Sequence, residues 1–396
     1  MNDHKKNIVP NCALFNLGFR PFFLGALIFS IITVALWTTV YSFNMQLTLY
    51  PLSSYQWHAH EMIFGYSFAV IAGFLLTAVQ NWTGVQTLHG FPLLVLFSLW
   101  TIARVLLLFG TSFINIAAIF DLLFEFILIA ATATPVILTQ NWRQLGIVFK
   151  VLFLVLANLI FYLGIQGFIE QGVYWGIYLG FYLVISLIMM LGGRVVPFFI
   201  ERGVGYPVTL YNPKWLAIVS MVLFIGFFVV EVFIHNSMVS GSLAAGLCII
   251  TVVRLIGWYT KGIWKNPLLW GLYFSFVFIA SGFLLFALGV FAGVSKFLAI
   301  HSLAYGGIGI ITVSMMARVS LGHTGRDVLH PPKTVFIALL FLIVGTISRV
   351  ALPLADMQHY VTWIIVSQAL WIIAFLIMVI TYAPVLGTPR IDGKPG

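Results

Sequence analysis

The residues best suited to metal chemistry open one apolar stretch, the segment Trp57 to Met62, which reads Trp-His-Ala-His-Glu-Met. Imidazole suits haem iron or copper, and the thioether of Met62 adds affinity for Cu(I). On a helix, His58 shares its side with Glu61 and Met62. His60 is turned from His58 by about 200°. The two histidines are therefore expected to serve two neighbouring sites and not to chelate one ion.

A structural role is the alternative for the same segment. His58 and His60 can both cap the start of a helix at the membrane interface, beside an interfacial tryptophan, Trp57. In that case neither imidazole binds a metal. The sequence leaves both interpretations open.

A second group of polar residues closes another apolar stretch, between Arg318 and Arg326. Gly322 and Gly325 can form the left-handed turn that ends a helix. The two arginines either follow the charge distribution of the inner membrane face or hold an anion, such as a haem propionate, with paired donors. His323 is a candidate metal ligand, proton carrier or helix cap.

An internal match joins these two regions. His60 is followed by Phe-Gly at four and five residues and by Thr-Gly at 23 and 24 residues, and His301 is followed by Tyr-Gly and Thr-Gly at the same offsets. Bundles built from repeats place cofactors between related elements. The match therefore predicts that His60 and His301 face each other across one haem iron. Chance similarity, with His301 at an ordinary helix start, is the alternative.

Two further elements place an arginine beside a proline: Arg20 with Pro21, and Arg194 with Pro197. Proline is expected to interrupt the helical pattern at both places. Each arginine can bind an anion such as a propionate, or can anchor a helix end at the interface. The sequence does not decide between these roles.

Several charges fall within apolar stretches, where an ion must face the interior, pair or bind something. Asp121 and Glu125 are one turn apart on one helix face, so they can form a proton path. Arg104 or another helix can neutralise them. Structural ion pairs are expected for three lone charges: Glu231, Arg254 and Arg349.

Membrane helices must position these residues. Of 396 residues, 62% are hydrophobic and 7% are charged, which excludes a water-soluble fold. Apolar stretches of the roughly 20 residues that cross a bilayer recur along the chain, and backbone groups in lipid must bond within their own segment. An all-helical bundle of about twelve spans is predicted, at 22–42, 58–80, 91–109, 114–138, 146–168, 172–193, 214–234, 238–260, 268–290, 296–320, 333–354 and 360–384.

The net charge of +9 is a topology signal and does not indicate a nucleic-acid partner. With a cytoplasmic N-terminus, all 19 Lys and Arg residues except Arg104, Lys296 and Arg349 fall toward the inner side, as the positive-inside rule requires. Residues 1–396 are therefore expected to form one integral membrane domain, N-in and C-in, with inner-side tails at 1–20 and 385–396.

Known cofactor motifs of soluble proteins are missing from the sequence. Cys12 and Cys248 cannot build a disulfide framework or a Cys-type zinc site. There is no Gly-Lys-Ser/Thr phosphate loop, dinucleotide fingerprint or Cys-x-x-Cys-His haem attachment site. Any haem must therefore be held non-covalently, as haem b.

The motifs resemble those of the NnrS family of haem- and copper-containing bacterial membrane proteins, which are associated with nitric oxide stress and denitrification. The resemblance runs nearly from end to end. It rests on Leu-Gly-Phe-Arg-Pro-Phe-Phe at 17–23, Trp-His-Ala-His-Glu-Met at 57–62, Asn-Trp-Thr-Gly at 81–84, Gly-Gly-Arg-Val-Val-Pro-Phe at 192–198, and Met-Ala-Arg-Val-Ser-Leu-Gly-His-Thr-Gly-Arg at 316–326. The His-x-His-Glu-Met and Gly-His-Thr-Gly-Arg strings are its most specific parts.

The resemblance implies a twelve-helix protein of the bacterial inner membrane that contains haem and copper and protects the cell from nitric oxide. This small, uncharged ligand reaches a haem inside the bundle through the lipid bilayer. Its reduction to nitrous oxide would need two electrons and two protons per pair of molecules. Glu61 is the expected proton donor in catalysis, with Asp121 and Glu125 as the alternative, and the electron donor is unidentified.

On this hypothesis, His60 and His301 hold the haem, while His58 and Met62 serve a nearby copper. The propionates are held by inner-side arginines: Arg20, Arg194, Arg318 and Arg326. Other functions stay open, namely a transporter or channel, a metal- or haem-homeostasis protein without redox turnover, and a structural scaffold.

Overall fold

The structure is a computed structural model that describes residues 13–45, 49 and 51–394. Within these residues, twelve helical stretches are long and apolar enough to cross a membrane, and no strand is present. They comprise α1 (Phe19–Phe43), α2 (Ser54–His60) with η2 (Glu61–Ser67) and α3 (Phe68–Thr83), α4 (Gly90–Leu107), α5 (Ile114–Leu138), α6 (Leu145–Ile165), α7 (Gly172–Gly203), α8 (Lys214–Val229) with η5 (Val230–Ile234), α9 (Ser237–Trp258), α10 (Pro267–Ala292), α11 (Lys296–His301) with η7 (Ser302–Gly309) and α12 (Ile310–His323), α13 (Lys333–Thr346) with η8 (Ile347–Ala351) and α14 (Leu352–Ala355), and α15 (Tyr360–Gly387).

The predicted spans agree with these helices in number and place, so the polytopic helical bundle is confirmed. One boundary was wrong. Helix α7 does not end near residue 193 but continues through Pro197 to Gly203. Pro197 is buried inside the helix, near its end, where the Arg202 guanidinium lies over the Phe198 ring, 5.2 Å from its centroid. A proline costs an internal hydrogen bond but need not end a helix that its neighbours support.

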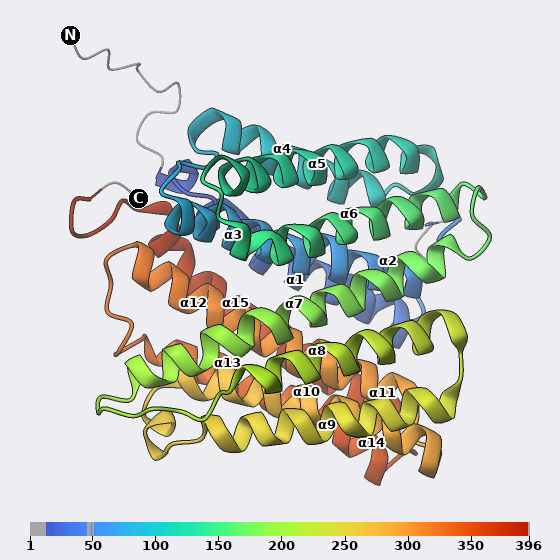
Figure 1. The fold of residues 1–396 in the computed structure, drawn as a ribbon. Coiled ribbons are helices and arrows are strands. Elements are labelled where there is room, and N and C mark those ends of the chain that lie inside the picture. Colours follow the sequence, from blue (N-terminus) through green and yellow to red (C-terminus); the bar gives the residue numbers. More distant parts are fainter. Residues whose placement is uncertain (1–12, 46–48, 50, 395–396) are drawn as a thin grey trace.

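Consecutive helices alternate in direction, so the start of α1 and the end of α15 lie at one end of the bundle (Figure 1). The Arg20 side chain of α1 donates from Nη1 to the carbonyl oxygens of Leu386 and Thr388, both at 2.7 Å. We call this the terminal end, and the opposite one the far end. Helices α4 to α6 lie along one side of the bundle and α8 to α10 along the other, with α7, α12 and α15 between them (Figure 1).

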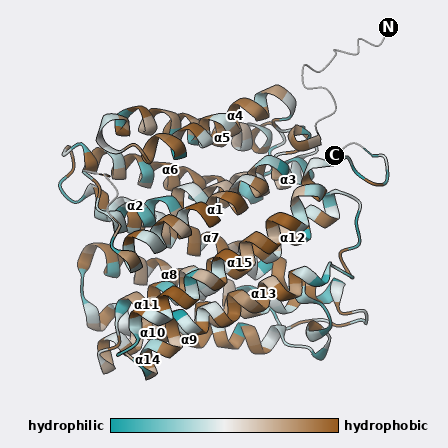
Figure 2. Ribbon diagram, turned by 180° about the vertical axis from the view of Figure 1, so that it is seen from behind, coloured by the Kyte–Doolittle hydropathy of each residue, from teal (hydrophilic) through white to brown (hydrophobic). Residues whose placement is uncertain are grey.

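Hydrophobic residues predominate along the helices, and hydrophilic residues gather toward the connecting segments (Figure 2). Large hydrophobic residues such as Ile218, Val222 and Ile256 are more than 60% exposed. A soluble protein rarely tolerates a continuous apolar exterior, whereas lipid requires it. The chain is therefore a multi-pass membrane protein.

The two regions joined by the internal sequence match also share their backbone. A π-helical segment starts directly after each matched histidine, η2 after His60 and η7 after His301. The matched Thr-Gly pairs follow, and both Gly84 and Gly325 have positive φ, 71° and 75°. π-Helical turns are rare and concentrate at functional sites. The local geometry is thus repeated in the two helices that carry the candidate histidines.

Candidate functional site

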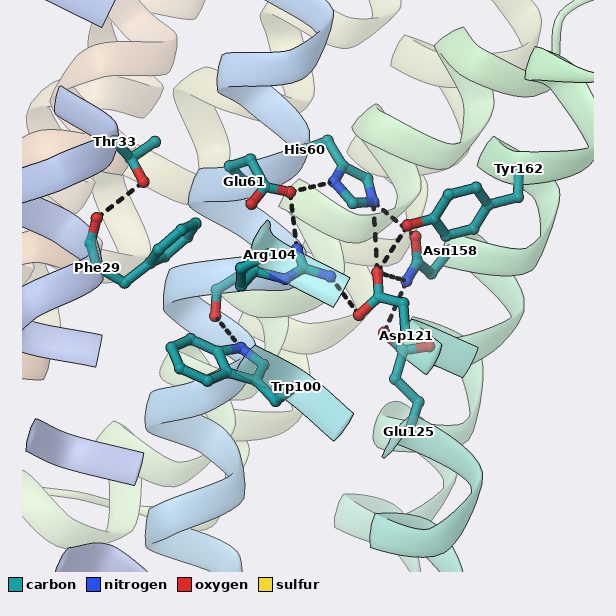
Figure 3. Close-up of polar contacts among 11 residues, drawn as sticks. Phe29, Thr33, His60, Glu61, Trp100, Arg104, Asp121, Glu125, Asn158 and Tyr162 are labelled. Carbon is teal, nitrogen blue, oxygen red and sulfur yellow. Dashed lines mark hydrogen bonds and ion pairs between the residues drawn. The ribbon is translucent and has the colours of Figure 1, made fainter. Parts of the chain in front are cut away.

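His60 ends α2 within a fully buried group of polar side chains from α4, α5 and α6 (Figure 3). Its Nδ1 lies 2.8 Å from Glu61 Oε1, and its Nε2 lies 2.9 Å from Asn158 Oδ1. The amide of Asn158 is oriented by its own Nδ2, which donates to Asp121 at 3.1 Å and to Glu125 at 2.9 Å. Both ring nitrogens of His60 therefore face acceptors, and neither offers a lone pair to a metal in this arrangement.

Arg104 joins two of the carboxylates across helices (Figure 3). Its Nη1 donates to Glu61 Oε1 at 2.7 Å, and its Nη2 forms an ion pair with Asp121. Tyr162 donates its hydroxyl to Asp121 Oδ2 at 2.9 Å. The predicted neutralisation of Asp121 by Arg104 is confirmed. Charges this deep persist only when paired and hydrogen-bonded.

The set His60, Glu61, Arg104, Asp121, Glu125, Asn158 and Tyr162 is hereafter the Arg104 cluster. It opposes three carboxyl groups to one permanent cation, Arg104, and every member is at most 3% exposed. The second oxygens of Glu61 and Glu125 accept no hydrogen bond from the described residues. Because burying uncompensated negative charge is very costly, the cluster must also hold protons.

Gly65, in the π-helical segment η2, makes this arrangement possible. A Cβ at this position would lie 2.5 Å from the Phe29 ring and 3.2 Å from the Arg104 side chain. Trp100 Nε1 donates to the Gly65 carbonyl oxygen at 3.1 Å. The absence of a side chain at Gly65 therefore lets Arg104 reach Glu61.

A second group gathers His58, His301 and Arg349 at the far end. His301 Nδ1 lies 2.7 Å from the Phe297 carbonyl oxygen, and its Nε2 lies 3.0 Å from Arg349 Nη2. The carbonyl can only accept and the guanidinium can only donate, so Nδ1 carries the proton and Nε2 the lone pair. His58 and Arg349 both lie within electrostatic range of His301.

The His58 ring is held by stacking. It lies on the Trp37 indole with 4.6 Å between ring centroids and 9° between planes. Its Nδ1 is buried and has no hydrogen-bond partner among the described residues. Arg349 also donates to the Tyr360 hydroxyl at 3.3 Å, but no described carboxylate pairs with it. The ion pair expected for Arg349 is absent from the described residues, and this far-end site presents imidazoles and a cation without an acid.

The structure therefore changes the histidine pairing. His58, and not His60, is the imidazole near His301, while His60 belongs to the Arg104 cluster. The expectation that Glu61 shares its side with His58 was wrong, because Glu61 bonds to His60. The helix changes from α to π at Glu61, which alters the phase on which that expectation depended. The haem role of the His60 and His301 pair stays a prediction that this geometry does not favour.

The far-end site suits haem iron better than copper. A metal-bound histidine usually donates its other ring nitrogen to a carbonyl or carboxylate, as His301 does to Phe297. His58 supplies a second, unsatisfied imidazole nitrogen. Within the described residues, no group of three or more His, Cys, Asp or Glu side chains is arranged to hold a metal ion. Met62 packs its side chain against the apolar core. The described residues therefore do not fit a copper site.

The arginines of the terminal end are tied to helix ends. Arg20 donates to the last carbonyls of α15, and Arg390 Nη1 donates to the His323 carbonyl oxygen at 2.9 Å. Arg326 Nη2 lies 3.3 Å from Thr388 Oγ1. Positive charge at a helix C-terminus satisfies its free carbonyls and its dipole. These contacts of Arg20, Arg326 and Arg390 hold α1, α12 and α15 together, and we call them the arginine clasp.

The remaining candidates of this region lie apart from one another. Arg318 stacks on Phe199 at 3.8 Å from its centroid, and the His323 ring packs against Phe19 with 5.7 Å between centroids. Arg194 is exposed. Arg254 is buried with Trp258 beneath its guanidinium and pairs with no described carboxylate, so its expected ion pair is absent there, whereas Glu231 pairs with Lys296 as expected.

Distance separates the arginines of the terminal end from a haem at the far-end site. The Phe19 amide donates to Thr77 Oγ1, so Arg20 lies level with Thr77. Thr77 follows His58 by 19 residues, which corresponds to roughly 28 Å along a helix. A porphyrin held by His58 does not extend that far. The propionate role of these arginines stays a prediction, and for Arg20 and Arg326 it would require a haem away from His58, where Arg349 is the nearby guanidinium.

Sequence reasoning missed four side chains of these sites: Trp37, Asn158, Tyr162 and the role of Arg349. An asparagine in the apolar α6 was a usable signal, since polar groups at membrane depth need partners. Trp37 and Tyr162 carry no such signal, because aromatic residues occur throughout this chain.

A known protein family matches nearly all of the described helices. The family model described as NnrS protein matches residues 13–390, from before α1 to the segment after α15. No curated protein matches the chain. The matched region includes the Arg104 cluster, the far-end site and the arginine clasp. The chain is thus a member of the NnrS family.

Proposed function

We propose that this protein binds haem b between His58 and His301 at the far end of the bundle and uses it to capture nitric oxide. The carrying observation is the fixed tautomer of His301, whose Nε2 keeps a lone pair, together with the unsatisfied ring nitrogen of His58, which lies within electrostatic range of His301. Membership of the NnrS family fits a nitric oxide response protein. Haem iron, when bound, supplies the centre that binds nitric oxide.

The chain's own residues hold and orient this site. Phe297 fixes the rotation of the His301 ring through its carbonyl, and Trp37 fixes the plane of the His58 ring. His301 Nε2, to which Arg349 donates in this structure, would hold the haem iron, and the Arg349 guanidinium would then bind a haem carboxylate.

The Arg104 cluster supports a role in proton supply. Reduction of two nitric oxide molecules to nitrous oxide and water consumes two electrons and two protons. The cluster begins two residues from His58 and holds protons because its carboxyl groups outnumber its permanent cation. Within the described residues no electron-donor site is evident. The proposed function is therefore the capture of nitric oxide, and its reduction is an extension of that proposal.

The test compares histidine variants of the purified protein by haem content and spectrum. We expect His58→Ala and His301→Ala to lose or shift the Soret band, whereas His60→Ala keeps it. His359→Ala is the matched control, because His359 is an exposed far-end histidine bonded to Asp356. A normal spectrum in both His58→Ala and His301→Ala would refute the ligand pair.

Anaerobic mixing of the reduced protein with nitric oxide separates capture from reduction. A stable spectral change without nitrous oxide supports capture, and nitrous oxide formed with added electron donor supports reduction. Colourless protein that inserts normally into membranes would contradict both. It would favour a transporter or haem-homeostasis protein, for which an interior cluster with excess carboxyl groups is the supporting observation.

A further inference from the structure

A half-open apolar cavity lies between the two helices that carry the candidate histidines. It has a volume of about 100 Å³ and is bounded by α3, α7 and α12, with α1 and α10 contributing one residue each. Its wall includes Ser67, Val70, Val184, Ile311 and Thr312, and the rest of the wall is apolar. None of these residues belongs to the far-end site or to the Arg104 cluster.

The wall offers no free hydrogen-bond donor to an occupant. Ser67 and Thr312 are its two hydroxyl side chains, and both donate to backbone carbonyls. Ser67 Oγ donates to the Met62 carbonyl oxygen at 2.7 Å, and Thr312 Oγ1 donates to that of Ile308 at 2.7 Å. Thr312 is further engaged by the Tyr66 hydroxyl at 2.5 Å. Because buried water needs about two to four polar partners, this cavity is a poor site for water.

Size restricts the remaining occupants. Apolar cavities of about 150 Å³ in proteins stay dry and take benzene or xenon. At about 100 Å³ the cavity accepts a molecule of a few atoms but not a porphyrin. We propose that it is a binding site for a small, uncharged, apolar molecule. That this molecule is nitric oxide rests on the function proposed above.

The position of the cavity supports its connection with the far-end site. Ser67 is the last residue of η2, and Ile311 follows closely after η7, so the cavity begins where both π-helical segments end. Ser67 follows His58 by nine residues, which is about 13 Å along the helix. A lipid-soluble gas held here is stored within the membrane, close to the proposed iron.

Xenon tests the site independently of haem. We expect ¹²⁹Xe NMR, or anomalous scattering from xenon-pressurised crystals, to show xenon in the wild-type cavity. Val70→Phe should fill the cavity and abolish the signal, and Val184→Leu, a smaller enlargement, should weaken it. Val222→Phe, the same substitution on the exposed side of α8, should leave it unchanged. No xenon in the wild type, or full binding in folded Val70→Phe, would overturn the proposal.

Flash photolysis of nitric oxide from the haem-loaded protein tests the identity of the ligand. We expect a fast recombination phase, from nitric oxide that stays inside the protein, to be lost in Val70→Phe and kept in Val222→Phe. An identical fast phase in both variants would overturn nitric oxide as the occupant, even if xenon binds. An acyl chain that copurifies and blocks xenon would overturn the gas site itself. If the protein holds no haem, the proposed function fails, and the xenon result still decides on the cavity.

Discussion

Arg349 Nη2 lies 3.0 Å from Nε2 of His301 and donates a hydrogen bond to the one nitrogen that a metal would need. The arginine has no described carboxylate partner, although it lies among membrane helices and is 9% exposed. An unpaired buried guanidinium beside two imidazoles is costly unless an anion joins it. The pair therefore supports the proposed haem, which would bring both a metal for His301 and a carboxylate for Arg349.

Replacement of Arg349 should distinguish binding of the haem carboxylates from binding of the haem iron. We expect Arg349→Ala to weaken the binding of haem roughly tenfold or more, because a hydrogen bond to a charged group contributes about 1.5–3 kcal/mol. The same variant should bind haem dimethyl ester, which has no free carboxylates, as well as the wild type does. The measurement is titration of the apoprotein followed by the Soret band. Equal losses with both porphyrins would show that Arg349 does not hold a haem carboxylate.

Arg104 should be the most sensitive charge of the bundle. We expect Arg104→Met to lower stability by about 3–5 kcal/mol, because it leaves buried carboxylates without their cation. Lys296→Met removes the cation from the partly exposed pair with Glu231 and should cost about 1 kcal/mol or less. Thermal unfolding in detergent measures both. We expect the double variant Arg104→Met with Asp121→Asn to recover part of the lost stability. A loss in Arg104→Met no larger than that in Lys296→Met would contradict the assigned pairing.

The carboxyl groups of the Arg104 cluster should differ in the effect of their removal. Glu61 pairs directly with Arg104, whereas Glu125 accepts, among the described residues, only from Asn158 Nδ2. We expect Glu61→Gln to lower the thermal midpoint. Glu125→Gln keeps an acceptor for Asn158 and removes surplus acid, so it should leave the midpoint unchanged or raise it. The reverse order of the two variants would show that Glu125 is the carboxylate that balances the arginine.

The clasp at the terminal end should depend on pH through Asp392. The hydrogen bond from Arg390 lowers the pKa of this exposed carboxyl. A lowered folded-state pKa means that the stabilising contribution is present above the unfolded value, about 3.9, and is lost as the pH falls through the folded one. Asp392→Asn should therefore reduce stability slightly at pH 7 and have no effect in strong acid. If the difference in stability between the wild type and Asp392→Asn persisted at low pH, the pair of Arg390 and Asp392 would be excluded as its cause.

Much of the bundle could be predicted from hydropathy, because lipid leaves few solutions for an apolar chain. The starts of α5, α7 and α8 agree with the predicted residues. The polar sites could be predicted only as candidates. Helix phase assigns a face correctly while the helix stays α-helical, as it did for Asp121 and Glu125, which bond to one amide.

That phase failed at Glu61, where η2 begins. The pairing of His60 with His301 rested instead on the internal sequence match, which the two π-helical segments share but which does not fix which histidine faces the other helix. Partners from other helices, such as Asn158 for His60 and Arg349 for His301, depend on packing between segments far apart in the chain. No periodicity within one helix contains that information. The arginine clasp shows the same limit, because Arg20 and Leu386 meet only when the first and last helices pack.

The π-helical segments have a consequence for how these helices can change. One extra residue in a turn advances every preceding side chain by about 100° relative to the rest of the helix. Helices α3 and α12 can therefore keep their packed registers while the histidines before η2 and η7 are aimed independently. A single-residue deletion in η2 would reorient His58 and His60 together and leave the cavity wall in place. The direction of the two histidines and the packing of the rest of the span can therefore vary separately.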